Sequence, residues 1–136
     1  MRNLAERLIA YERTQNKITK TKTPPEISVF DRLRPQLATL MGNAGFRAIL
    51  TRALVLSHEE VPWLRAMHVI ADGTLVHVDE RQAHGNRRKI AAGNVVLLAQ
   101  LLGLLAVFIG DDLTLHLVRE TWPKLPLNTL YHGKGY

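Results

Sequence analysis

Apolar residues recur at helical spacing from the beginning of the chain. Leu4, Leu8, Tyr11 and Ile18 follow one another at intervals of four, three and seven residues, and Gln15 interrupts the stripe. This narrow stripe is typical of a helix that packs along one seam, and it predicts a helix over residues 2–20. Because an isolated helix of this length is marginally stable in water, it packs either on its own domain or on a partner chain.

A break follows this first helix. Threonine and lysine alternate over residues 19–23, and Pro24 and Pro25 come next. β-Branched residues, like charges and a proline pair all oppose helix continuation. We therefore expect a basic amphipathic helical arm with its linker over 1–23, a single globular helical domain over 26–130, and a C-terminal tail over 131–136.

Helical periodicity continues in the globular part. Residues 26–41 carry apolar positions at helical spacing, and Pro35 lies among them. The proline either kinks one helix or opens a second one at its first turn. Gly42-Asn43-Ala44-Gly45 then interrupts the pattern, with Asn43 suited to cap a following helix, and a new apolar stripe runs over 46–57.

Residues 80–92 are polar and basic, which predicts a loop, and the most apolar segment of the chain follows them. Residues 95–109 are apolar nearly all round, which predicts the central helix of the core. We expect Asn94 to cap this helix and Gly103 to mark a close contact with another helix. Gly110 is a stop signal, and a last helix is predicted over 112–122.

Hydrophobic alternation with a period of two appears only over residues 63–79. The dipeptide Asp72-Gly73 in this segment favours a two-residue turn and predicts a hairpin over about 65–79. A turn at that place would pair His68 directly with His77. The predicted fold class is therefore mostly α, an α-dominated α+β arrangement of four to five helices and one small β-hairpin. We expect the core to include Phe46, Leu50, Leu54, Met67, Val69, Leu98, Leu102, Leu105, Leu117 and Trp122.

Composition excludes several classes of protein. The chain has 136 residues, 46% of them hydrophobic, and no cysteine. This length suits one domain with a core of its own. The absence of cysteine excludes a disulfide framework, a cysteine-type zinc site, an iron–sulfur cluster and a thiol nucleophile. The stretch 95–109 is shorter than the roughly 20 residues of a spanning helix, and charges interrupt the N-terminal residues, so we expect a cytoplasmic protein without a membrane span.

The net charge of +6 is concentrated in two segments. Residues 1–23 hold six basic residues against two acidic ones, and residues 81–89 hold four basic residues and no acidic one. Clusters of this kind bind phosphate backbones through charge alone, so nucleic-acid association through segments 2–22 and 81–89 is one hypothesis. The residues that would carry it are Arg13, Lys17, Lys20, Lys22, Arg87, Arg88 and Lys89.

Candidate chemistry is sparse. His68 and His77, if opposed across the hairpin, could together ligate a metal ion, but zinc needs three or four ligands and no recognised motif supplies the others. No glycine-rich phosphate loop, nucleophile elbow or catalytic triad is present, so a protein that is not an enzyme and needs no cofactor is favoured.

The arm supplies the leading functional hypothesis. A helix behind a proline hinge can reach a neighbouring molecule, so its stripe of Leu4, Leu8, Tyr11 and Ile18 could recognise a protein partner or another copy of the chain. We therefore expect a non-enzymatic interaction or assembly module. Packing of the arm on its own domain is the open alternative.

Overall fold

The computed structural model describes residues 1–69, 75–77 and 87–125, and it is dominated by helices. The mostly α class predicted from the sequence is confirmed. The described elements are α1 (Arg2–Thr19), α2 (Pro25–Ser57), the short 3₁₀ helix η1 (Pro62–Ala66), the strands β1 (Met67–Val69) and β2 (Leu75–His77), α4 (Arg87–Ile109) and α5 (Asp111–Thr121).

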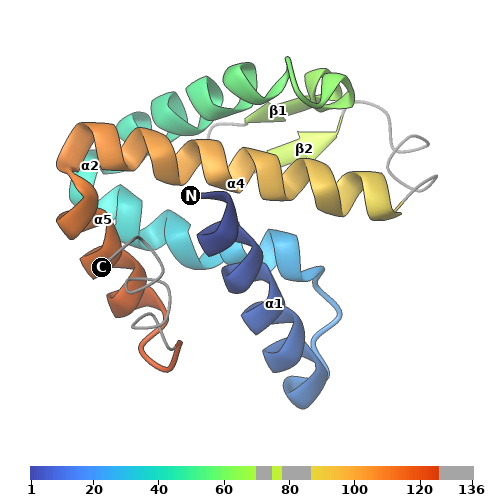
Figure 1. Cartoon of the computed structure of the whole chain (residues 1–136). Helices are drawn as coiled ribbons and strands as arrows, with labels where there is room; N and C mark the ends of the chain where they lie inside the picture. The colour runs from blue at the N-terminus through green and yellow to red at the C-terminus, as the bar shows by residue number, and fades with distance from the viewer. Residues whose placement is uncertain (70–74, 78–86, 126–136) are drawn as a thin grey trace.

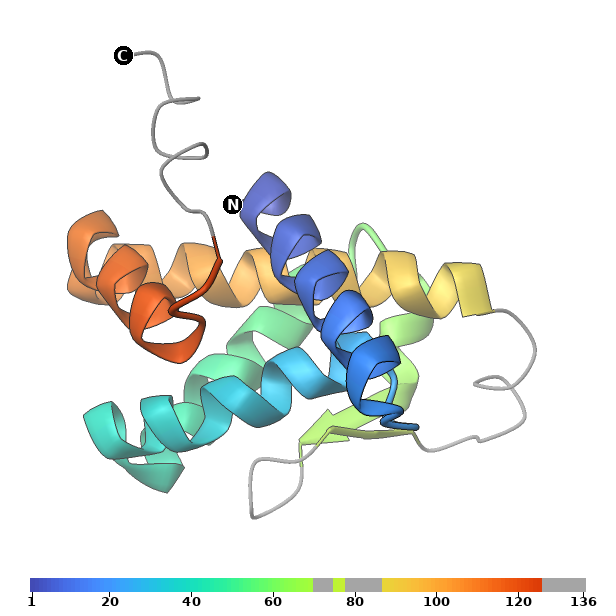
Figure 2. The same cartoon turned by 90° about the horizontal axis from the view of Figure 1, so that it is seen from below.

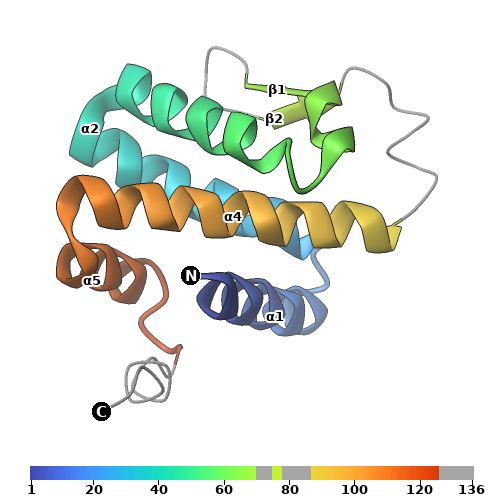
Figure 3. The same cartoon turned by 45° about the horizontal axis from the view of Figure 1, so that its top comes forward.

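Helix α4 runs through the middle of the molecule. Helices α1 and α5 lie on one side of it, and the second half of α2 lies on the other side with the two strands (Figures 1 and 3). The leucines of α4 that face these neighbours are fully buried, which confirms the predicted central core helix. They are Leu97, Leu98, Leu101, Leu102 and Leu105.

The start of α4 differs from the prediction. The helix begins at Arg87 rather than at residue 95, so the predicted loop over 80–92 is wrong in its last part. Asn94 does not cap the helix, because it lies within it and is 2% exposed. Ala91 and Ala92 are strong helix formers, and they extend the helix through a segment whose charge suggested a loop.

Helix α2 consists of two helical halves joined at one residue. Gly42 adopts φ 77° and ψ 164°, a conformation that favours glycine, and the chain doubles back there (Figure 3). The predicted break is therefore confirmed, but it occupies a single residue. Pro35 lies inside the first half without ending it.

Helix α1 packs on the rest of its own chain. It ends at Lys20, which adopts a left-handed conformation, and the next helix begins with Pro25 in its first turn, as expected of proline. Figure 2 shows α1 crossing α4. At its other end the Arg2 guanidinium binds the Glu60 carboxylate at 2.6 Å, and this contact raises the pKa of Arg2. The arm is thus part of the globular body in this structure.

The predicted hairpin over 65–79 is not supported in the predicted form. The described strands have three residues each, and they pair antiparallel with Met67 opposite His77 and His68 opposite Val76. This register is shifted by one residue from the predicted one, because the connection comprises residues 70–74 rather than a two-residue turn. Residues 70–74, which include Asp72 and Gly73, and residues 78–79 lie outside the described residues.

Most of the predicted core is buried. Eight of the ten expected residues are buried, and Val69 and Leu117 are partly buried. The predicted core lacks the contribution of the first helix, where Leu4, Ala5, Leu8 and Ile9 join the same cluster. The predicted tail over 131–136 lies outside the described residues.

Gly93 is a place where helix α4 tolerates no side chain. A Cβ atom built there would lie 2.3 Å from Cζ2 of Trp63. We expect Gly93→Ala to lower the free energy of unfolding by about 1–3 kcal/mol, because the indole must move, although alanine is the better helix former. Urea denaturation measures the loss. Trp63→Leu combined with Gly93→Ala should recover most of it, and equal losses with and without Trp63 would contradict the steric explanation.

Candidate functional site

The apolar stripe of the first helix does not form a continuous exposed surface. Leu4 and Leu8 are buried in the core of the chain, and Tyr11 is half-buried against it. Only Ile18, at the C-terminal end of α1, is exposed, with 69% of its surface accessible. The stripe therefore serves packing within the chain, and only its last residue remains for a partner.

The predicted basic residues lie at one end of the molecule. Lys17, Lys20 and Lys22 are exposed around the end of α1, and the run 87–89 begins α4 on the same side in Figure 1. Arg13 lies 3.9 Å from the buried Glu26 carboxylate. The structure thus places the basic end of α1 and the run 87–89 toward one end without joining them into one described surface.

The histidine pair is not brought together. Residues directly opposite each other in an antiparallel pair share a face, and His77 is opposite Met67 while His68 is opposite Val76. The two histidines therefore occupy register positions of opposite faces, and the pairing on which the metal hypothesis rested is not present. Within residues 1–69, 75–77 and 87–125, no group of three or more His, Cys, Asp or Glu could hold a metal ion.

One face of α4 has no neighbouring element among the described residues. In Figures 1 and 3, no described helix or strand covers the side of α4 that faces the viewer. Ala92 is exposed, Ala99 and Gly103 are half-buried, and Val107 is 84% exposed. A Cβ atom at Gly103 would meet nothing within 4 Å, so the predicted close helix contact at this glycine is absent among the described residues.

Large apolar side chains are also exposed near the end of α4. Phe108 is 75% exposed in the last turn of α4, and Leu113 is 58% exposed in the first turn of α5. Because a helix turns once in about 3.6 residues, Phe108 lies on a different side of α4 from Ala99 and Gly103. We therefore refer to Ala92, Ala99, Gly103 and Val107 as the α4 face. A sequence signal for it existed, because a helix that is apolar all round needs apolar neighbours on every side, and three packed neighbours leave one side open.

The same helix passes a length and composition test for membrane spans. Residues 92–109 of α4 have a mean hydropathy of 2.2, and 44% of this window is buried within the protein. Among the described residues it is the one segment that passes, and the core helix of a soluble protein passes the same test. This feature alone therefore assigns no location.

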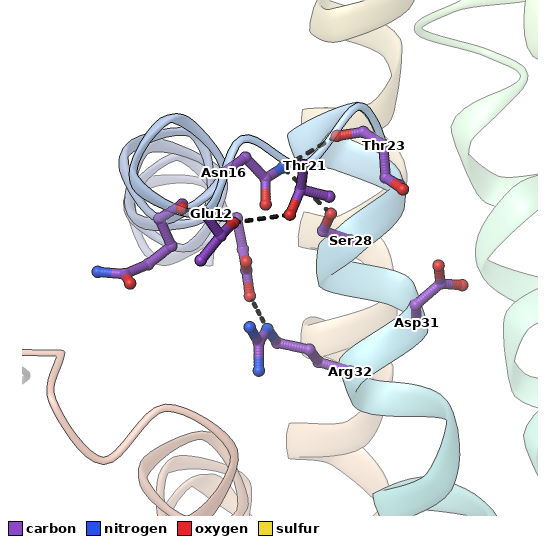
Figure 4. A pocket seen from close by; sticks show the side chains of 9 residues that line it. Glu12, Asn16, Thr21, Thr23, Ser28, Asp31 and Arg32 are labelled. Atoms are coloured by element: carbon purple, nitrogen blue, oxygen red, sulfur yellow. Dashed lines mark hydrogen bonds and ion pairs between the residues drawn. The ribbon is translucent and has the colours of Figure 1, made fainter.

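A polar pocket lies between the C-terminal half of α1 and the start of α2. It has a volume of about 320 Å³, and Figure 4 shows the side chains that line it. Three structural segments contribute, namely α1, the connection after it and α2. The lining residues are Glu12, Gln15, Asn16, Thr19, Thr21, Thr23, Ser28, Asp31 and Arg32.

Glu12 is the unusual member of this pocket, because its side chain is fully buried. Its Oε1 atom accepts a hydrogen bond of 2.8 Å from Trp122 Nε1 and forms an ion pair with Arg32 Nε. Its Oε2 atom is equally buried and has no hydrogen-bond partner in the part of the chain that the structure describes. Glu12 is not among the site residues predicted from the sequence, although Leu4, Leu8 and Glu12 follow at intervals of four and therefore share one helix face.

Hydrogen bonds also order the part of the pocket that is formed by the end of α1 and the connection to α2. Asn16 Nδ2 donates to the carbonyl oxygen of Thr23 at 2.9 Å and to Ser28 Oγ at 3.3 Å. The hydroxyls of Thr19 and Thr21 are 2.7 Å apart. These bonds fix the connection between the two helices, so the pocket has a defined shape.

Comparisons with protein-family models, with curated proteins and with solved structures find no match to this chain.

Proposed function

We propose that the protein is a non-enzymatic helical assembly module that pairs with a second copy of itself through the α4 face. The arm stripe is not the recognition surface in this proposal, because its leucines are already used in the core. The observation that carries the proposal is the exposure of Val107 at 84% on a helix face that no described element covers.

The composition of this face suits a pairing of two identical helices. Ala92, Ala99 and Gly103 are small, so two backbones could approach closely. Residues 90–110 contain no Asp, Glu, Lys or Arg. In a twofold pairing each surface meets its own copy, so a face without charge brings no like charges together at the centre.

The charges that flank α4 favour an antiparallel arrangement. The basic run 87–89 begins the helix, and the exposed Asp111 and Asp112 follow its end. The two groups lie about equally far along the chain from Ala99 and Gln100. An antiparallel pairing centred there would bring the basic end of each copy beside the acidic end of the other, which sets register and orientation.

Substitution of the exposed valine tests the use of this face. We expect Val107→Glu to weaken self-association at least about tenfold, which corresponds to about 1.4 kcal/mol, because it buries a charge at the pairing surface. Sedimentation equilibrium measures the dissociation constant. Val55→Glu and Ile18→Glu are matched controls at exposed apolar positions on α2 and α1, and they should leave it unchanged.

Charge reversal tests the antiparallel register within the same experiment. Replacing Arg87, Arg88 and Lys89 with glutamate should weaken the dimer. Replacing Asp111 and Asp112 with lysine should also weaken it, and combining the two sets of substitutions should restore it. A monomer at all accessible concentrations, a dimer lost only through Ile18→Glu, or no restoration by the combination would each contradict the proposal. Recovery of the protein with lipid vesicles instead would indicate that α4 meets a membrane.

The nucleic-acid alternative predicts a different response from the same variants. Its supporting observation is that the C-terminal end of α1 and the run 87–89 at the start of α4 lie toward one end of the molecule (Figure 1). Replacing residues 87–89 with glutamate would then abolish salt-sensitive binding of a DNA or RNA duplex. Adding lysine at positions 111 and 112 would not restore this binding. Restoration of a dimer by the combined variant would favour self-association.

A further inference from the structure

We propose that the pocket between α1 and α2 binds a small zwitterion of the α-amino acid class. The ligand's ammonium group would bind the buried Oε2 atom of Glu12, and its carboxylate would bind the guanidinium of Arg32. This binding site is independent of the proposed pairing through α4, since none of its lining residues belongs to the α4 face.

The buried carboxylate of Glu12 has one oxygen atom without a hydrogen-bond donor among the described residues. Buried polar atoms in proteins are nearly always hydrogen-bonded, and an unpaired one costs free energy comparable to its desolvation. Both donors that reach Glu12, from Trp122 and Arg32, bind Oε1, and Oε2 has none. Oε2 therefore lacks the donor that a buried carboxylate oxygen ordinarily has, and a charged N–H group is the donor that matches it best.

Arg32 supplies a positive charge beside Glu12 in the lining of the pocket. Figure 4 shows Glu12 and Arg32 extending toward each other across the gap between the two helices. Arg32 uses its Nε atom on Glu12, and its side chain is 52% exposed. Guanidinium groups bind carboxylates through two parallel hydrogen bonds, so the remaining nitrogens of Arg32 suit the carboxylate of a ligand.

The charged groups of Glu12 and Arg32 lie next to each other, as the ammonium and carboxylate groups of an α-amino acid do. A ligand with only an ammonium group would leave the guanidinium without a second partner, and a ligand with only a carboxylate would leave Oε2 unmet. Asp31 does not compete, because Arg34 already binds its carboxylate at 2.7 Å. The hydroxyls of Thr21 and Ser28 and the amide of Gln15 line the rest of the pocket, so it favours a polar ligand side chain.

The size of the pocket fits this ligand class. A volume of about 320 Å³ is at the lower end of the range of small-molecule sites, which is roughly 300–1,000 Å³. The lining contains no aromatic residue, which disfavours sugars and nucleobases because both commonly stack on aromatic rings. An ordered water molecule on Oε2 is the competing explanation, and it predicts no ligand selectivity.

Ligand titration of the full chain tests the proposal, with the indole N–H signal of Trp122 as the NMR probe. Trp63→Phe distinguishes this signal from that of the other tryptophan. The panel consists of α-amino acids, with methylammonium, acetate and glycerol as partial probes. We expect at least one amino acid to shift the signal saturably with a dissociation constant below about 1 mM, and each partial probe to bind at least about tenfold more weakly.

Two variants and two controls locate the ligand. Glu12→Gln keeps the acceptor for Trp122 and removes the charge, and Arg32→Gln removes the guanidinium. Each should weaken binding at least about tenfold. Glu59→Gln and Arg52→Gln, at exposed positions outside the pocket, are the matched controls and should bind as the unchanged chain does. Because Arg32 is half exposed, its variant keeps the test decisive even if Glu12→Gln impairs folding.

The proposal fails if no amino acid gives a saturable shift, if methylammonium binds as tightly as the best amino acid, or if binding survives Arg32→Gln. None of these results would affect the mass measurements on Val107→Glu, so failure here is distinguishable from failure of the proposed self-association.

Discussion

Leu8→Ala is expected to lower the free energy of unfolding by about 2–5 kcal/mol, whereas Ile18→Ala is expected to change it by less than about 0.5 kcal/mol. The two residues belong to the same apolar stripe of α1. Leu8 is 0% exposed and packs in the central cluster, and Ile18 is 69% exposed. The difference arises because only the first substitution opens a cavity against α2 and α4.

Urea denaturation at one fixed protein concentration measures both changes. Far-ultraviolet circular dichroism before denaturation checks that each variant is folded. Removal of residues 1–23 should have a larger effect still, because it exposes the surface that Leu4, Ala5, Leu8 and Ile9 cover. A truncated chain with the stability of the full chain would contradict packing of α1 within the molecule and would return the arm to a role in binding a partner.

This contrast explains how far periodicity alone predicts the fold. The 4-3-7 spacing of the stripe predicted α1 correctly, because helical geometry places those positions on one face whatever they pack against. The spacing contains no information about which surface covers the stripe. Packing within the chain and packing on a partner give the same pattern, and only the arrangement of α2 and α4 distinguishes them.

For the central helix α4, the sequence pattern predicted the burial of the helix but neither its start nor its open face. Its apolar character over 95–109 predicted a core helix, and Leu98, Leu102 and Leu105 are buried as expected. Its predicted start at residue 95 is wrong, because the charged run 87–89 indicates a loop by composition and yet belongs to the helix. The open face could not be located, because a helix that is apolar all round does not indicate which side lacks a neighbour.

Hydrophobic periodicity alone predicted neither the arrangement of His68 and His77 nor the pocket around Glu12. The shift of one residue between β1 and β2 depends on the connection between them, and a shift of one exchanges the faces of a strand. The pocket is lined by residues between positions 12 and 32, but its buried Glu12 is bonded to Trp122, which lies 110 positions away along the chain. Only the i, i+4 relation of Leu4, Leu8 and Glu12 indicated from the sequence that this glutamate faces inward.

The bond between Trp122 and Glu12 leads to the second large expected effect. Trp122 is 2% exposed, and its indole nitrogen donates to the buried carboxylate of Glu12 at 2.8 Å. We expect Trp122→Ala to lower the free energy of unfolding by about 3–5 kcal/mol, because it removes a large buried side chain and one of the two donors to Glu12.

Trp122→Phe separates these two contributions. Phenylalanine keeps most of the ring packing and loses the N–H group, so we expect a smaller loss of about 1.5–3 kcal/mol, the range for a hydrogen bond to a charged group. Urea denaturation of Trp122→Phe, Glu12→Gln and the double variant gives the coupling between the two residues. A coupling near zero would show that the indole acts only by its volume. A large coupling would mean that α1 and the chain after α5 are held together by one buried polar contact, which also orients the carboxylate that lines the pocket.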